Sequence, residues 1–174
     1  MVAIKNFLFL ATAVTALTIG KRDTATILND ISAINSNVQT LTTAANNYNG
    51  GLLAAIPILT AQSNLGTAID KGTTDARATP QLSSADSQSI VAAVDRLTPS
   101  VEASLTAIRA KKARFAADGL TTTVQNSLAT LKTKTDTFSD ALIAISSSDT
   151  KATGTAQKAK IDGYFNAAIA DFAS

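Results

Sequence analysis

The stretch DTATILNDISAINSNVQTLTTAANNYNGG, residues 23–51, contains the clearest structural pattern in the sequence. Its apolar residues recur at alternating steps of four and three: Ile27, Ile31, Ile34, Val38, Leu41, Ala45 and Tyr48. This spacing places all of them on one stripe of an α-helix. Asp23 or Thr24 can cap the start of the helix, because a short side-chain oxygen accepts a hydrogen bond from a free backbone N–H. Gly50 and Gly51 end it, because glycine readily adopts the left-handed conformation that closes a helix.

Four later segments carry apolar residues at spacings that suit a helix, and they predict four further amphipathic helices. Their apolar stripes are Leu52, Ile56, Leu59, Leu65 and Ile69; then Ile90, Val94, Leu97, Val101, Leu105 and Ile108; then Val124, Leu128, Leu131, Phe138, Leu142 and Ile145; and finally Ile161, Phe165, Ala168, Ile169 and Phe172. Almost no segment alternates with the period of two that is typical of a strand. Amphipathic helices must bury their stripes against one another, so the expected fold is all-α, a bundle of about five helices.

Several helix boundaries can be predicted from breakers. The second helix is expected to end near Asp70 to Gly72, followed by a turn-rich link over residues 71–81. Pro99 is expected to kink the third helix or to divide it in two, because proline removes a backbone hydrogen bond. The fourth helix is expected to stop at residues 146–149, and the fifth to begin near Thr155.

The N-terminus has the features of a signal peptide. Lys5 precedes an apolar run over residues 7–19, and Val14 and Ala16 are small residues at the spacing that signal peptidase reads. We predict a signal peptide over residues 1–16, a pro-segment over residues 17–22 and a mature domain over residues 23–174. The alternatives are a buried N-terminal helix and an incidental Lys21-Arg22 pair. The mature chain is then expected to be secreted, without a transmembrane segment.

Processing at Lys21-Arg22 changes the charge of the protein. The whole chain has 15 basic and 13 acidic residues, a net charge of +2. Removal of Lys5, Lys21 and Arg22 leaves 12 minus 13, or −1. The basic isoelectric point therefore belongs to the precursor and gives no indication of a nucleic-acid partner.

The residue types present exclude most catalytic chemistry. The chain has no cysteine and no histidine, which argues against a zinc or copper site, a histidine general base and a Cys–His pair. It also lacks a Gly-X-Ser-X-Gly elbow and a phosphate-binding glycine loop. We therefore expect no enzyme, no catalytic residues, no cofactor and no metal.

Two polar features each have two interpretations. Arg109, Lys111, Lys112 and Arg114 could bind an anion, but we favour cations that complement the negative end of a helix. Thr135 interrupts an apolar stripe. It could face a polar group of a ligand, but we favour a hydrogen bond to its own backbone.

The apolar stripes also suggest a binding site. Alanine-rich faces and prolines within helices can leave the centre of a bundle incompletely filled, and such cavities hold apolar ligands. A bundle about 30 to 40 Å long could hold a fatty acyl chain lengthwise. The candidate lining residues are Ile31, Ile34, Val38, Leu41, Ile56, Leu59, Val94, Leu97, Val101, Leu105, Leu128, Leu131, Phe138, Leu142, Phe165 and Ile169.

A family resemblance adds to this interpretation. It rests on Arg22-Asp23, residues 27–31 (ILNDI), residues 38–42 (VQTLT), residues 47–51 (NYNGG), residues 89–94 (SIVAAV) and Tyr164-Phe165. In these segments the chain resembles, over about residues 22–174, the fungal hydrophobic surface-binding protein A family, which includes the ligand-binding domains of cell-wall mannoproteins. The resemblance implies a secreted or wall-associated fungal helical domain. It also implies fatty-acid binding in a central cavity, adsorption to hydrophobic surfaces, or recruitment of a secreted polyester hydrolase.

Three functions therefore compete. The first is a secreted carrier that binds fatty acids or similar lipids inside the bundle. The second is a protein that adsorbs to hydrophobic solids through its weakly charged first two helices, without an internal ligand. The third is a solid structural bundle that binds protein or glycan at the cell wall. Because the sequence shows no second domain, Ser/Thr-rich stalk or anchor, covalent attachment to the wall is not expected.

Overall fold

The computed structural model describes the backbone of residues 9–173 and the side chains of residues 24–173. The described elements are α1 (Phe9–Asn47), the 3₁₀ turn η1 (Leu52–Ala55), α2 (Ile56–Ala78), α3 (Ser84–Arg109), α4 (Lys112–Ala117), α5 (Thr121–Ile145) and α6 (Lys151–Ala173). Over residues 9–173 the structure contains helices and turns and no strand. The predicted all-α fold is confirmed.

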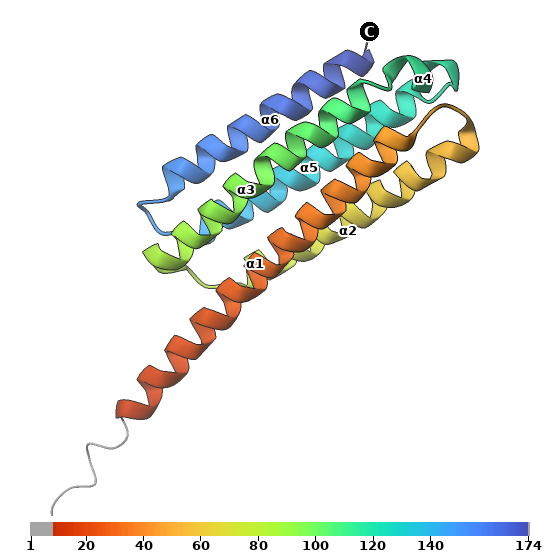
Figure 1. Ribbon diagram of the computed structural model, residues 1–174. Coiled ribbons are helices and arrows are strands. Elements are labelled where there is room, and N and C mark those ends of the chain that lie inside the picture. Colours follow the sequence, from red (N-terminus) through yellow and green to blue (C-terminus); the bar gives the residue numbers. More distant parts are fainter. Residues whose placement is uncertain (1–8, 174) are drawn as a thin grey trace, which may run out of the picture.

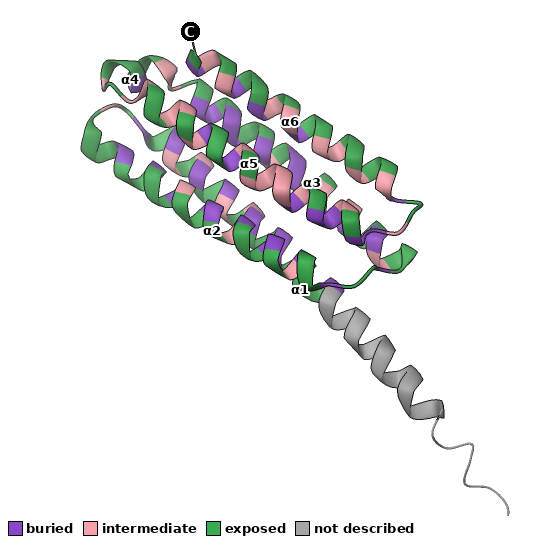
Figure 2. Cartoon of the chain, turned by 180° about the vertical axis from the view of Figure 1, so that it is seen from behind, coloured by how far each residue is buried: buried purple, intermediate pink, exposed green. Residues whose placement is uncertain are grey.

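The five long helices form a closed ring. Going round it, α1 packs against α2, α2 against α5, α5 against α6, α6 against α3, and α3 against α1. The chain runs back and forth along the ring axis, so the end of α1, the start of α2 and the short α4 share one end (Figure 1). We call this the α4 end. Figure 2 shows the buried positions facing inward and the exposed positions on the outside.

The predicted stripe of α1 forms one wall of the core. Ile27, Ile31, Ile34, Val38, Leu41, Ala45 and Tyr48 are all buried. On the outer face of α1, Ser36, Thr40 and Thr43 donate side-chain hydrogen bonds to backbone carbonyls four residues earlier. These hydroxyls replace charged side chains as the polar surface of the helix.

The start of α1 differs from the prediction. The helical backbone already begins at Phe9, so in the unprocessed chain neither Asp23 nor Thr24 is a helix cap. No proline interrupts residues 9–23, so the helix has no strong breaker there. The predicted cleavage sites, including Lys21 and Arg22, lie outside the part of the chain whose side chains are described.

The predicted link over residues 71–81 is largely wrong, because α2 continues to Ala78. Gly72 lies against Phe138 of α5: a Cβ added to Gly72 would lie 3.0 Å from the Phe138 ring. The Thr73 and Thr74 hydroxyls donate to the carbonyls of Ile69 and Asp70. Glycine and threonine here suggested a turn, but Gly72 allows close packing against α5, and Thr73 and Thr74 bond to the helix backbone.

Two other boundaries also shift. Helix α3 runs through Pro99 without interruption, so its division into two helices was wrong. The Pro99 side chain is exposed, and its ring therefore does not disturb the core. Helix α6 begins at Lys151 rather than near Thr155. Gly154 within it lies close to Ile143, where a Cβ would be 3.2 Å from Cγ1 of that residue.

An aromatic cluster fixes the α4 end. The rings of Tyr48 and Phe115 stack with centroids 4.5 Å apart, and Phe172 lies against Phe115 at 6.1 Å. Gly50 and Gly51 turn the chain with positive φ angles of 101° and 98°. Phe115 belongs to the short helix α4 and is buried there.

The basic residues at positions 109, 111, 112 and 114, here called the basic cluster, include three that bind neighbouring groups at this end. Lys111 Nζ donates to the carbonyls of Asn46 and Tyr48, each at 2.8 Å, and thus neutralises the C-terminal end of α1. Arg114 binds the side chain of Asn49, and Arg109 forms an ion pair with Asp171. The favoured interpretation of this cluster holds for Lys111, although the helix end that it complements is that of α1.

One described segment, residues 52–78, is long and apolar enough to cross a membrane by length and composition. In this structure its inner face packs against α1 and α5. Ile58, Leu65 and Ile69 are buried there. It is therefore a wall of the bundle, with an unusually apolar outer face at its start.

Candidate functional site: an apolar cavity inside the helix ring

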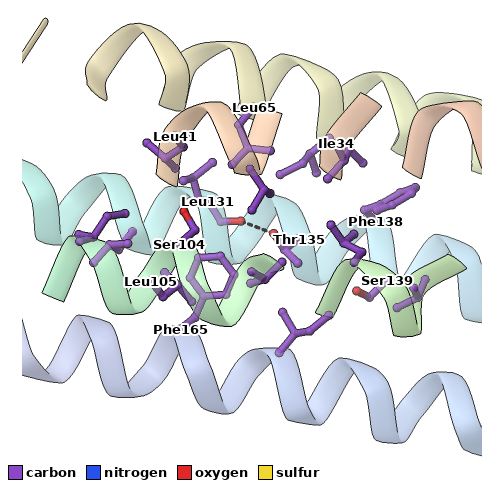
Figure 3. A pocket seen from close by; sticks show the side chains of 18 of the residues that line it. Ile34, Leu41, Leu65, Ser104, Leu105, Leu131, Thr135, Phe138, Ser139 and Phe165 are labelled. Carbon is purple, nitrogen blue, oxygen red and sulfur yellow. Dashed lines mark hydrogen bonds between the residues drawn. The ribbon is translucent and has the colours of Figure 1, made fainter. Parts of the chain in front are cut away.

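A cavity of about 60 Å³ lies along the axis of the ring. Its walls come from all five long helices, and the side chains point toward one another across it (Figure 3). The lining residues are Ile34, Val38, Leu41, Leu65, Ile69, Val94, Leu97, Val101, Ser104, Leu105, Ile108, Leu128, Leu131, Thr135, Phe138, Ser139, Leu142, Ile161 and Phe165.

The ring geometry explains why a cavity forms. Packed helices lie about 8–10 Å apart, so five in a regular ring have their axes about 7–8.5 Å from its centre. A helix with its side chains has a radius of about 5–6 Å, which leaves a narrow axial space. The side chains around this axis are mostly branched aliphatic residues, with aromatic rings only at Phe138 and Phe165. They leave part of the space unfilled.

Most of the residues predicted from the stripes meet at this cavity. Ile34, Val38, Leu41, Val94, Leu97, Val101, Leu105, Leu128, Leu131, Phe138, Leu142 and Phe165 line it. Ile31 is buried in the core but does not line the cavity. Ile169 is partly buried and packs against the core.

Two predicted residues lie elsewhere. Ile56 is 52% exposed and Leu59 is 44% exposed, both at the start of α2. The buried face of α2 begins with Ile58 and continues through Ala61 to Leu65, at steps of three and four. Leu59 and Leu65 are six residues apart, so Ile56 and Leu59 do not share the helix face of Leu65.

The stripe reasoning did not select several residues that line the cavity. Leu65, Ile69, Ile108 and Ile161 were placed on stripes but were not chosen as site residues. Ser104 and Ser139 were missed entirely, because serine on an apolar stripe normally marks an edge of the buried face. Their neighbours Leu105 and Leu142 carried the only signal that could have pointed to them.

The few polar groups in the cavity differ in their bonding. The Thr135 hydroxyl donates to the Leu131 carbonyl at 2.8 Å, as favoured from the sequence, while the residue also lines the cavity. Ser104 is 4% exposed, and its Oγ is among the buried polar atoms of the described residues that have no hydrogen-bond partner. Among the residues whose side chains are described, none that lines the cavity is charged. It can therefore take an apolar chain and offer one hydroxyl to an uncharged polar atom.

Two smaller pockets of about 30 Å³ each adjoin the cavity at opposite ends. The first, which we call the mouth, lies at the α4 end between α2, α4 and α5. It shares Ile108, Leu128 and Leu131 with the cavity. The second lies between α3, α5 and α6 and shares Val94, Ser139, Leu142 and Ile161. The three hollows thus form a row along the bundle.

The second pocket has a polar rim that hydrogen bonds hold closed. The side-chain amide of Gln157 donates to the Val91 carbonyl and to Asp95. Lys158 Nζ binds Asp140 at 2.5 Å, and this hydrogen bond raises the pKa of Lys158, which therefore stays charged. These contacts link α6 to both α3 and α5.

A family profile for hydrophobic surface binding protein A matches residues 24–144. The chain belongs to this family. The match covers the first four predicted helices, which contribute most of the cavity wall. A comparison with curated proteins gave no match.

Solved structures extend the family comparison. The chain is 40% identical to AfMp4p, whose crystal structure is a complex with palmitic acid. The match has a TM-score of 0.84 and covers 86% of this chain and 99% of that one. Ligand-binding domain 1 of the Penicillium marneffei MP1 protein, complexed with arachidonic acids, matches with a TM-score of 0.79 at 17% identity, over 83% and 94% of the two chains.

Ligand-binding domain 2 of the same protein, complexed with multiple arachidonic acids, matches at 20% identity with a TM-score of 0.80, over 84% and 93%. At these identities the two MP1 domains show only that this chain shares their fold.

Proposed function

We propose that this protein binds a long-chain fatty acid, or a similar amphipathic lipid, in the axial cavity. The observation that carries the proposal is a cavity with apolar walls from five helices and no charged side chain. The palmitic acid complex of AfMp4p, at 40% identity over nearly its whole chain, supports the same ligand class. Transfer of each CH₂ group from water into the cavity contributes about 0.8 kcal/mol before ordering costs.

The two ends of the cavity differ from its centre in what they offer to a carboxylate. A charged head group in the apolar centre would lose its hydration without a compensating partner. Gln62 and Ser127 line the mouth, and Gln157 and Lys158 line the opposite pocket. The head group therefore lies at an end of the cavity. The Ser104 hydroxyl is available to lipids that carry an uncharged oxygen along the acyl chain.

Bulky substitution inside the cavity tests this proposal. Leu131→Trp or Leu105→Trp fills the axial space, so palmitic acid uptake, measured by calorimetric titration, is lost while helix content by circular dichroism is retained. Ala129→Trp is the matched control, because Ala129 lies on the exposed face of the same helix. Uptake that survives both cavity substitutions would contradict an internal site.

Adsorption to hydrophobic surfaces is a second candidate function. It is favoured by the exposed side chains of Leu52, Leu53, Ile56 and Leu59. Depletion of the protein onto hydrophobic beads distinguishes the two functions. A pure adsorber is depleted equally with and without fatty acid and shows no saturable uptake in solution.

We also propose that the protein is exported and that the mature chain begins at Asp23. The apolar run over residues 7–19 and the Lys21-Arg22 pair support this. Expression of the full chain in a yeast and N-terminal sequencing of the protein in the medium tests it. Retention in the cell, or an N-terminus upstream of residue 17, would contradict the processing scheme.

A further inference from the structure

A patch of large apolar side chains lies outside the core at the α4 end. Among the described side chains, Leu52 is 64% exposed, Leu53 82%, Ile56 52% and Leu59 44%. They fall within eight consecutive residues, in η1 and the first turn of α2, and together form what we call the apolar patch. Exposed apolar side chains that cluster in this way mark sites of contact with a partner or a membrane.

The apolar patch is continuous with the cavity. Leu59 belongs both to the patch and to the lining of the mouth, beside Ile58 and Val124. The mouth in turn shares Leu128 and Leu131 with the axial cavity. An apolar path therefore runs from the surface, between α2 and α5, to the interior.

The polar bonds nearest this path do not join α2 to α5, because Tyr48 and the Gly51 N–H bind Asp118 at the end of α4. The ion pair between α2 and α5 joins Asp70 to Lys134, about 16 Å along α2 from Leu59. The start of α2 follows two glycines and a 3₁₀ turn, and its N-cap has no side-chain hydrogen bond. At the other end of the cavity, Gln157 and Lys158 tie α6 to its neighbours.

The charges around the patch favour a lipid surface rather than a protein as its partner. Between Thr24 and Ile69 the only charged residue is Asp30, which lies toward the opposite end of α1 from Tyr48. Four basic residues lie at the α4 end, Arg109, Lys111, Lys112 and Arg114, together with two acidic ones, Asp118 and Asp171. Basic side chains therefore outnumber acidic ones there. An apolar tip with a net basic surround matches a membrane that carries anionic lipids.

We infer that the mouth is the gate through which lipid enters and leaves, and that the apolar patch docks this gate onto an anionic lipid surface. The inference rests on the proposed fatty-acid binding and adds its route and its donor. The small volume of the empty cavity requires the helices to part before a long chain can enter. Docking of the patch places the separating helices against the lipid, so the acyl chain moves from membrane to cavity without crossing water.

The test compares uptake from vesicles with uptake from solution. The docking variant carries Leu52→Asn, Leu53→Asn and Ile56→Asn, all at exposed positions. Transfer of a fluorescent palmitic acid analogue is timed from phosphatidylcholine vesicles with and without phosphatidylglycerol. We expect the variant to slow transfer at least about tenfold, because three side chains lose apolar contact with the bilayer. Its affinity for the same analogue in solution should stay within about twofold of the parent.

Two control variants separate apolar contact from other effects. Leu52→Met, Leu53→Met and Ile56→Met together keep the patch apolar and should retain fast transfer. Ala152→Asn, Ala156→Asn and Ala159→Asn, at exposed positions on α6, should also leave transfer unchanged. Phosphatidylglycerol should accelerate transfer by the parent protein, and added salt should remove that acceleration.

A separate substitution tests the gate. Ser127→Trp fills the mouth without reaching the centre of the axial cavity, so it should slow both association and dissociation of the analogue. Equal transfer rates for the parent and the docking variant would overturn docking, and unaltered rates in Ser127→Trp would overturn the gate. Failure of the parent protein to bind the analogue in solution would instead overturn the proposed function on which the inference rests.

Discussion

At the scale of single residues, Tyr48 links the segment that follows α1 to α4. It is 1% exposed, stacks on Phe115 and donates its hydroxyl proton to Asp118. Asp118 also accepts from the Gly51 N–H at 2.7 Å. The hydrogen bond from Tyr48, with the Gly51 amide, holds the pKa of Asp118 below its usual value. Burial, together with Asp118, raises the pKa of Tyr48 from 10.0 to about 12.

Tyr48→Phe tests this link. The ring stack is kept, so the expected loss is about 1–2 kcal/mol of unfolding free energy from the charge-assisted hydrogen bond. Because the folded-state pKa of Tyr48 is raised, its contribution is present below pH 10.0 and is lost as the pH rises toward about 12. Urea denaturation at a series of pH values should show a smaller alkaline decline in the variant. An identical decline would show that Tyr48 is not the group responsible.

Two helical glycines make a matched pair. Gly163 on α6 is exposed and has no atom within 4 Å of an added Cβ, whereas the Cβ at Gly72 would lie 3.0 Å from the Phe138 ring. Gly163→Ala should stabilise the protein by about 0.5–1 kcal/mol. Gly72→Ala should destabilise it by about 1–2 kcal/mol, because the substitution overpacks the α2–α5 contact. Thermal denaturation checks both, and equal stabilisation by the two would show that the contact at Gly72 is loose.

Displacement of Phe138 has a consequence for the site as well. The ring lines the axial cavity, so an alanine at position 72 pushes it toward the space that the ligand needs. Gly72→Ala should therefore weaken palmitic acid binding, while Gly163→Ala should not. Calorimetric titration of the two variants measures this difference.

At the scale of the elements, apolar spacing was a good guide to helices and a poor guide to their ends. The stripes of α1, α3 and α5 identify most of the cavity wall, because the spacing reports which face of a helix is buried. Gly72, Thr73 and Thr74 suggested a turn, yet they continue α2. Glycine there allows close contact with Phe138, and the threonines bond to the helix backbone. Such tertiary contacts have no signature in the sequence of α2 alone.

Ile56 and Leu59 were placed on the wrong face for a simpler reason. They were joined to the stripe of Leu65 and Ile69 across a step of six residues, whereas the buried face of α2 runs through Ile58, Ala61 and Leu65. The cavity itself could be expected only as a possibility of five-helix packing. Its position depends on the closed order of the ring, which pairs α3 with α6 and α2 with α5.

Pro99 offers a test at this scale. It lies exposed inside α3, where its missing N–H leaves the usual bond to the Asp95 carbonyl unmade. Pro99→Ala should restore that bond and stabilise the protein by about 1–3 kcal/mol, less the small gain that proline gives by restricting the unfolded chain. Urea denaturation measures the change. Destabilisation would indicate that the shape of α3 around Pro99 is needed for packing against α1 and α6.

At the scale of the whole molecule, stability and binding rest on the same row of apolar residues. No disulfide supports the fold, since the sequence contains no cysteine, and the core of the ring also provides the walls of the cavity. The polar bonds between helices use side chains outside the cavity lining, with Lys111 and Asp118 at the α4 end, Gln157 and Lys158 toward the other end, and the pairs Lys132–Asp162 and Lys134–Asp70 between them. The axis can thus accept an apolar ligand while these bonds fix the helix order.

Native mass spectrometry of the purified protein, before and after addition of palmitic acid, tests internal lipid binding most directly. The protein is first extracted with organic solvent and refolded without detergent, so that any lipid acquired during expression is removed. We predict a complex of defined stoichiometry for the parent and for Ala129→Trp, and bare protein for Leu131→Trp. Bare protein in all three samples, or equal loading of Leu131→Trp and the parent, would contradict a fatty-acid site inside the helix ring.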